Sequence, residues 1–229
     1  MRRFSGTMLA AFLFYGIAVL WLPNRWSWAA FQLGIFALTA AWLLAALLQR
    51  RTLVWSASLL PITGVPVWGL LQLLTGHTVY RWSTWLALLD WFTFLATAFV
   101  ALQVFTDSHL RHGFLRAVAW FALVLGAVAA TQMFTSGGKV YWLFESGYKD
   151  FVLGPFVYRN QYSAFIELLL PVVLWNAVVD RRRAWLYWIT AGVMFASVIA
   201  GASRAGAVLV SIEIIVFLVF ATAARSPLS

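Results

Sequence analysis

The chain contains no cysteine, which excludes disulfide bonds and cysteine-based metal or redox sites. Charge is also scarce: 10% of the 229 residues are charged, against about 25% in a typical soluble domain. A secretory signal pattern is missing too, because the apolar run behind the basic segment 1–6 ends at Trp21-Leu22-Pro23 without a small-residue cleavage site. The low charge argues against a soluble domain, and we interpret the first apolar run as a membrane helix.

Apolar residues make up 63% of the chain and gather in long stretches. About 20 apolar residues in a helix cross the hydrocarbon core of a bilayer, and lipid offers unpaired backbone groups no partner. Trp residues near the stretch ends, such as Trp28, are expected at headgroup level. Pro61, Gly64 and Pro66 are expected to kink the third stretch. We predict an all-α integral membrane protein with eight spans, at residues 7–22, 27–48, 57–74, 82–106, 114–134, 160–179, 184–201 and 204–224.

The net charge of +9 comes from cations scattered over short loops, so it does not indicate a nucleic-acid partner. With a cytoplasmic N-terminus, the inner loops hold ten of the 16 Lys and Arg residues, and every run of adjacent arginines falls inside. This bias follows the positive-inside rule. We therefore predict an N-in/C-in topology, with Lys149 and Asp150 outside and Arg181–Arg183 inside.

Three acidic residues, Asp90, Glu167 and Glu213, lie within predicted spans. Each is eight or nine residues from the outer end of its span, which is a depth of roughly 12 Å. Carboxyl groups are costly in a membrane and normally face the bundle interior or a wet cavity. The sequence leaves two arrangements open: one shared polar layer beneath the outer face, or three independent contacts with neighbouring helices.

Two segments carry the strongest candidate site residues. Gly154–Ala164 (GPFVYRNQYSA) leads into the sixth span, and Gly201–Ala207 (GASRAGA) is a tight turn before the eighth. Each places an arginine, Arg159 or Arg204, at the start of a helix on the outer side, and Ser203 is expected to cap the eighth helix. A helix N-terminus and a guanidinium together favour a phosphate-like anion. The alternative is that both arginines only extend to the outer headgroups.

These segments resemble motifs of the O-antigen ligase and polymerase family of bacterial inner membranes. Gly154–Ala164 is similar to the family's Gly-x-x-x-N/R-N-x-x-A segment, and Ser203-Arg204-Ala205-Gly206 is similar to its Ser-Arg-Gly/Ala turn. The resemblance covers about residues 150–215, and the intervening spans have the expected separation. It implies a five-helix N-terminal region (1–134), a periplasmic loop (135–159) and a motif region (160–229).

The resemblance also implies an activity. Family members transfer a glycan from an undecaprenyl-pyrophosphate carrier to lipid A-core or to a growing polysaccharide, at the periplasmic face and without a metal or other cofactor. The expected partners are therefore membrane lipid and the carrier-linked glycan. Arg159 and Arg204 match the positions that contact the pyrophosphate and are the candidate catalytic residues. The candidate substrate-binding residues are Tyr158, Asn160, Ser203, Lys149, Glu167, Glu213 and Asp90.

The chain departs from the family in length. Family members continue after the Ser-Arg helix with a large periplasmic loop, which carries a functional histidine, and with further spans. Here the sequence ends at Ser229, and His77, His109 and His112 do not match that position. The expectation is a truncated or split member that a C-terminal half or a partner subunit would complete. A small-solute transporter, or a non-catalytic subunit of a larger membrane assembly, is the alternative from another class.

Overall fold

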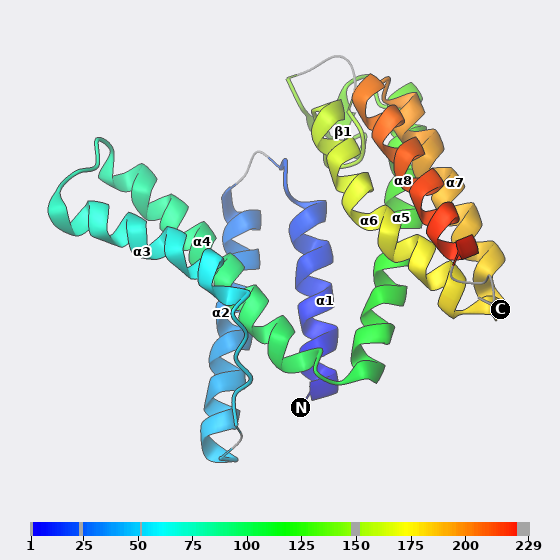
Figure 1. Cartoon of the computed structure of the whole chain (residues 1–229). Coiled ribbons are helices and arrows are strands. Elements are labelled where there is room, and N and C mark those ends of the chain that lie inside the picture. The colour runs from blue at the N-terminus through cyan, green and yellow to red at the C-terminus, as the bar shows by residue number, and fades with distance from the viewer. Residues whose placement is uncertain (1, 23–24, 51, 148–151, 224–229) are drawn as a thin grey trace. The chain divides into compact units, whose positions relative to one another are not determined.

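The computed structural model describes residues 2–22, 25–50, 52–147 and 152–223 (Figure 1). Each predicted span overlaps a helix of the described residues, so the all-α prediction is confirmed, and a count of eight membrane spans stays a prediction. The helices of the described residues are α1 (Arg2–Ala18), α2 (Arg25–Leu48), α3 (Leu59–Thr75), α4 (Arg81–Val104), α5 (Ser108–Thr135), α6 (Arg159–Val179), α7 (Ala184–Ala200) and α8 (Arg204–Ala223). A short 3-10 turn, η1 (Arg181–Arg183), links α6 to α7.

Six helical segments of the described residues are long and apolar enough to cross a membrane. They are α2, α4, α5, α6, the η1–α7 segment and Arg204–Ala221 of α8. The helix α3 is apolar but shorter, at 17 residues, and it continues through Pro66 without interruption. The chain is therefore an all-α, multi-pass membrane protein.

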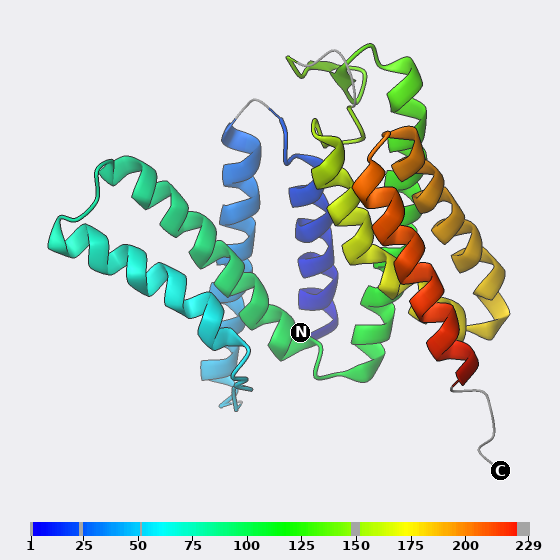
Figure 2. The ribbon, with the colours of Figure 1, turned by 45° about the horizontal axis from the view of Figure 1, so that its top comes forward.

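The chain divides into two compact units, which we describe separately. The first comprises residues 1–16 and 24–112, and the second residues 17–23 and 113–229. In the first unit, α3 and α4 lie side by side, and α4 also packs on α2 (Figures 1 and 2). Its apolar core joins α1, α2 and α4 through Leu9, Phe31, Ile35, Leu38, Trp42, Val100 and Val104.

The second unit packs α6 against both α7 and α8 (Figure 2). Small residues of α5 let this helix approach α7 closely: a Cβ added to Gly126 would lie 3.3 Å from Val193. Residues of α5 join the core of this unit. The core includes Ala122, Leu125, Ala129, Ile166, Leu170, Met194, Val198 and Val210.

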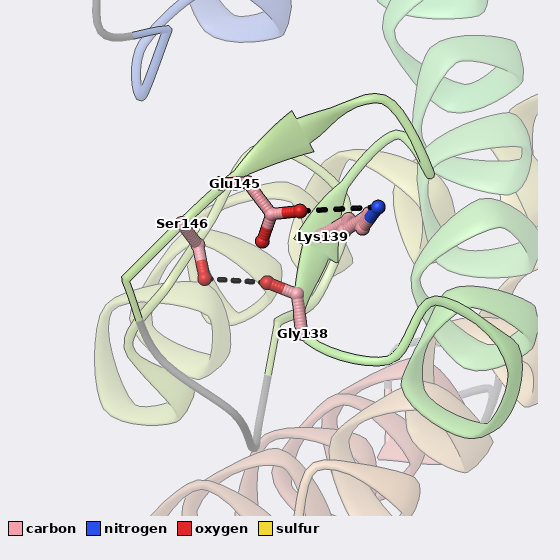
Figure 3. A network of polar contacts seen from close by, with 4 residues as sticks. All are labelled: Gly138, Lys139, Glu145 and Ser146. Atoms are coloured by element: carbon pink, nitrogen blue, oxygen red, sulfur yellow. Dashed lines mark hydrogen bonds and ion pairs between the residues drawn. The ribbon is translucent and has the colours of Figure 1, made fainter.

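Between α5 and α6 the chain forms a small hairpin, where the sequence predicted only a loop. The strands β1 (Lys139–Val140) and β2 (Phe144–Glu145) pair antiparallel, with Lys139 opposite Glu145. Figure 3 shows the contacts that close it: Lys139 Nζ lies 3.0 Å from a carboxylate oxygen of Glu145, and the Ser146 hydroxyl donates to the Gly138 carbonyl at 2.5 Å. Strands of two residues are too short to show an alternating pattern in the sequence.

Candidate functional site

The starts of α6 and α8 are joined by a hydrogen bond. The Ser203 hydroxyl donates to Asn160 Oδ1 at 3.2 Å and accepts the backbone N–H of Gly206 at 3.3 Å. The second bond is an N-cap, because α8 begins at Arg204 and the N–H three residues after the cap would otherwise lack a partner. The predicted capping role of Ser203 is therefore confirmed, and the same side chain also connects the two motif segments.

A glycine permits this close approach. A Cβ at Gly206 would collide with the Ser163 side chain, and it would lie 3.0 Å from the Ser203 hydroxyl oxygen. The Ser163 hydroxyl donates to the Arg159 carbonyl at 2.9 Å, so this serine is itself held within the first turn of α6. Asn160 contacts Ser203, and Ser163 lies against Gly206 three residues further along both helices. The two helices therefore begin at the same end of the second unit and run parallel.

Arg159 and Arg204 are the first residues of these two helices, and both are exposed. Two helix N-termini and two guanidinium-bearing residues thus lie at one end of the unit. N-terminal amides and cations both favour an anion. Tyr158 precedes α6 in an extended conformation, with its ring edge-on to Trp21 at a centroid distance of 5.6 Å.

The position of α6 depends on a buried glutamine that the sequence analysis did not identify. Gln132, on α5, has no exposed surface. Its Nε2 donates to the Gly154 carbonyl at 3.0 Å, and its Oε1 accepts the Tyr141 N–H at 3.3 Å. The side chain therefore connects α5 to the hairpin and to the turn before α6. An amide within an apolar helix, followed by a Gly-Pro turn, was the available signal, since a buried amide needs partners.

The turn itself is tightly built. Gly154 has a φ of 59°, in the left-handed region that glycine adopts at little cost. Leu153 and Phe156 exchange two backbone hydrogen bonds across it, at 2.8 and 3.0 Å. Residues 152–157 are buried, so the segment immediately before Tyr158 and Arg159 is part of the packed interior.

Two further polar contacts hold this end of the unit. The buried Tyr162 hydroxyl donates to Ser197 Oγ at 2.5 Å, which links α6 to α7. The Tyr141 hydroxyl donates to the Ala18 carbonyl at 2.8 Å. Burial raises the pKa of Tyr141 to about 12, so its hydroxyl remains a donor at neutral pH.

The acidic residues fall into two groups. Glu167 on α6 and Glu213 on α8 both belong to the second unit, eight and nine residues after the starts of their helices. Glu213 Oε2 is buried and has no hydrogen-bond partner within the described part of the chain. Because the two helices start side by side and run parallel, these positions agree with a common depth for the two glutamates.

Asp90 belongs to the first unit and has its own partners. Its Oδ1 accepts hydrogen bonds from Trp28 Nε1 at 2.7 Å and from Gln32 Nε2 at 2.9 Å, both on α2. This matches the alternative of an independent contact with a neighbouring helix, and it gives Trp28 a role besides the expected position at headgroup level. A common layer of all three acids stays a prediction.

The structure thus brings Tyr158, Arg159, Asn160, Ser203 and Arg204 to one end of the second unit, with Glu167 and Glu213 further along the same helices. The candidate Lys149 and its neighbour Asp150 lie outside the described residues. Comparisons with protein-family models, with curated proteins and with solved structures found no match to this chain.

Proposed function

We propose that this protein is a glycosyltransferase of the O-antigen ligase and polymerase type. It would lie in the bacterial inner membrane with eight spans and an N-in/C-in topology. It would transfer a glycan from an undecaprenyl-pyrophosphate carrier to lipid A-core or to a growing polysaccharide at the periplasmic face. The observation that carries the proposal is the hydrogen bond between Asn160 and Ser203, which places the starts of α6 and α8, and so Arg159 and Arg204, at one end of the second unit.

The chemistry explains why two fixed cations would matter. During transfer the bond between the sugar C1 and the pyrophosphate oxygen breaks, an acceptor hydroxyl oxygen bonds to C1, and its proton is released. Negative charge grows on the departing pyrophosphate, and preorganised donors that face this charge lower the barrier. Arg159 and Arg204 are the residues we assign to this role.

The neighbouring residues divide into two kinds. Ser203 is 3% exposed, and its hydroxyl serves both the α8 cap and Asn160, so we assign it a positioning role. Asn160 and Tyr158 are exposed beside Arg159, and we assign both to contact with the glycan donor. We assign no general base to this chain; a C-terminal half or a partner subunit would supply one.

The test compares two substitutions of Arg204. If this residue binds pyrophosphate through its planar guanidinium, Arg204→Lys keeps the charge but loses the bidentate geometry. Both Arg204→Lys and Arg204→Ala should then reduce glycan transfer by roughly tenfold or more, since a hydrogen bond to a charged group contributes about 1.5–3 kcal/mol. Membranes with matched protein amounts would be assayed with the carrier-linked glycan, and binding of the carrier would be measured if transfer requires a further subunit.

The matched control is Arg182→Ala, an exposed arginine of η1 in the same unit. It should leave transfer and carrier binding unchanged. If Arg204→Lys behaves like the wild type, the arginine only extends to the headgroups. Wild-type behaviour of both Arg204 variants would leave the proposal without its chemical basis.

A further inference from the structure

The first unit contains an apolar cavity that is separate from the candidate site. Its volume is about 640 Å³, and residues of α2, α3, α4 and the loop between α2 and α3 line it, among them Phe36, Leu43, Leu53, Leu59, Phe92 and Phe99. Thr39 and Thr63 are the polar residues of its lining, and each hydroxyl donates to a backbone carbonyl of its own helix at 2.8 Å. Apart from the largely exposed Trp55, the other lining residues are apolar, so the cavity suits a hydrocarbon chain.

A second cavity, of about 390 Å³, adjoins the first, and Leu53 lines both. Its polar lining comprises Arg2, Arg50, Thr52 and Gln103. The amide of Gln103 is bonded to the loop at both ends, because it donates to the Val54 carbonyl at 2.8 Å and accepts the Val54 N–H at 3.0 Å. The role of Gln103 is thus to fix the loop. The two guanidinium groups remain to recognise a ligand, together with Thr52 and with Trp42, whose buried Nε1 has no hydrogen-bond partner within the described residues.

The charged residues that line this second cavity are all cationic. No Asp or Glu lines it among the described residues, and within that part of the chain no acid pairs with Arg2 or Arg50. Two cations without a countercharge at the end of membrane helices favour an anionic group. A cationic cavity beside an apolar one matches a molecule with an anionic head and a hydrocarbon tail.

We propose that the first unit binds one anionic glycerophospholipid, with its phosphate on Arg2 and Arg50 and one acyl chain in the apolar cavity. In the predicted topology both arginines are cytoplasmic, so the lipid would come from the inner leaflet. This site does not depend on the proposed transferase activity. A zwitterionic lipid carries the same phosphate but also an ammonium group, so it gains less from the two arginines.

The experiment is native mass spectrometry of the full chain in detergent, with equal amounts of phosphatidylglycerol and phosphatidylcholine that have identical acyl chains. The wild type should retain one phosphatidylglycerol in roughly tenfold preference, as expected for two arginines near a lipid headgroup. Arg2→Gln with Arg50→Gln should abolish this preference. The control pair Arg25→Gln with Arg81→Gln changes two exposed arginines of the same unit that line neither cavity, and it should keep the preference.

The role of the apolar cavity has its own test. Phosphatidylglycerol with 16-carbon chains should be retained and the 6-carbon form lost, and Ala96→Phe, which fills the cavity lining, should reduce retention of the long-chain form. The chain-length comparison needs no substitution, so it remains informative if the Ala96 variant folds poorly. Equal retention of both headgroups, retention independent of chain length, or displacement of the lipid by inorganic phosphate alone would each overturn the proposal.

Discussion

In each unit a buried glutamine holds a loop against the helices, and the two glutamines differ in the number of segments that they connect. Gln103 makes both of its hydrogen bonds to a single loop residue, Val54, beside open cavities. Gln132 connects two separate segments, at Tyr141 and Gly154, and the second of these leads into α6. The apolar part of α4 in the first unit is 17% buried, against 50% for α6 in the second, although α8 of the second unit is only 11% buried.

The different hydrogen bonds of the two glutamines indicate that the two units are packed in different ways. In the second unit, buried polar contacts fix the start of α6 relative to α5, α7 and α8, as the proposed transferase site would require. In the first unit, the helices leave cavities between them, as the proposed lipid site would require.

The largest effect is expected at the contact between α6 and α8. Gly206→Ala would force a Cβ into Ser163 and should destabilise the second unit by about 1–3 kcal/mol, the usual cost of overpacking. It should also separate the two helix starts and reduce transfer. Gly192→Ala on α7 is the control, because a Cβ there meets nothing within 4 Å. Thermal unfolding in detergent would compare the two variants. Equal unfolding temperatures would contradict the close contact between Gly206 and Ser163.

The two glutamines provide a direct comparison. Gln132→Leu would leave the buried Gly154 carbonyl without its donor and should cost about 1–3 kcal/mol, the desolvation penalty of a buried unpaired group. Gln103→Leu should cost less, since the loop around Val54 is partly exposed and water can replace the amide. Thr131→Val, an exposed neighbour of Gln132, serves as the control. Chemical unfolding of the variants would rank them, and a larger loss for Gln103→Leu would reverse the contrast between the units.

The smallest effect is expected in the hairpin. Lys139 and Glu145 form an ion pair at 3.0 Å, but their side chains are 44% and 77% exposed. Exposed pairs contribute about 0–1 kcal/mol because water and salt screen them. Lys139→Ala should therefore leave the unfolding temperature nearly unchanged, at low and at high salt. A clear loss that salt diminishes would show that the hairpin contributes more to the second unit than its exposure suggests.

The sequence predicts the helices well because long apolar runs are a local signal, and a helix is the regular structure that satisfies its own backbone in lipid. It also predicts the Ser203 cap, which acts over three residues. It does not predict the partners of Gln132, Tyr162 or Asp90, which lie 22, 35 and 62 residues away. Periodicity shows that such polar residues lie in a helix, but the choice of partner depends on how distant helices pack.

One measurement tests the central claim, that α6 and α8 begin side by side. The chain has no native cysteine, so the double variant Asn160→Cys with Ser203→Cys offers a clean disulfide assay. Because these side chains are hydrogen-bonded at 3.2 Å, mild oxidation in membranes should cross-link them almost completely. Asn160→Cys with Ser211→Cys, two turns further along α8, should stay uncrosslinked. Failure of the 160–203 pair to cross-link, or equal cross-linking of both pairs, would contradict the convergence of the two motifs on which the proposed transferase site depends.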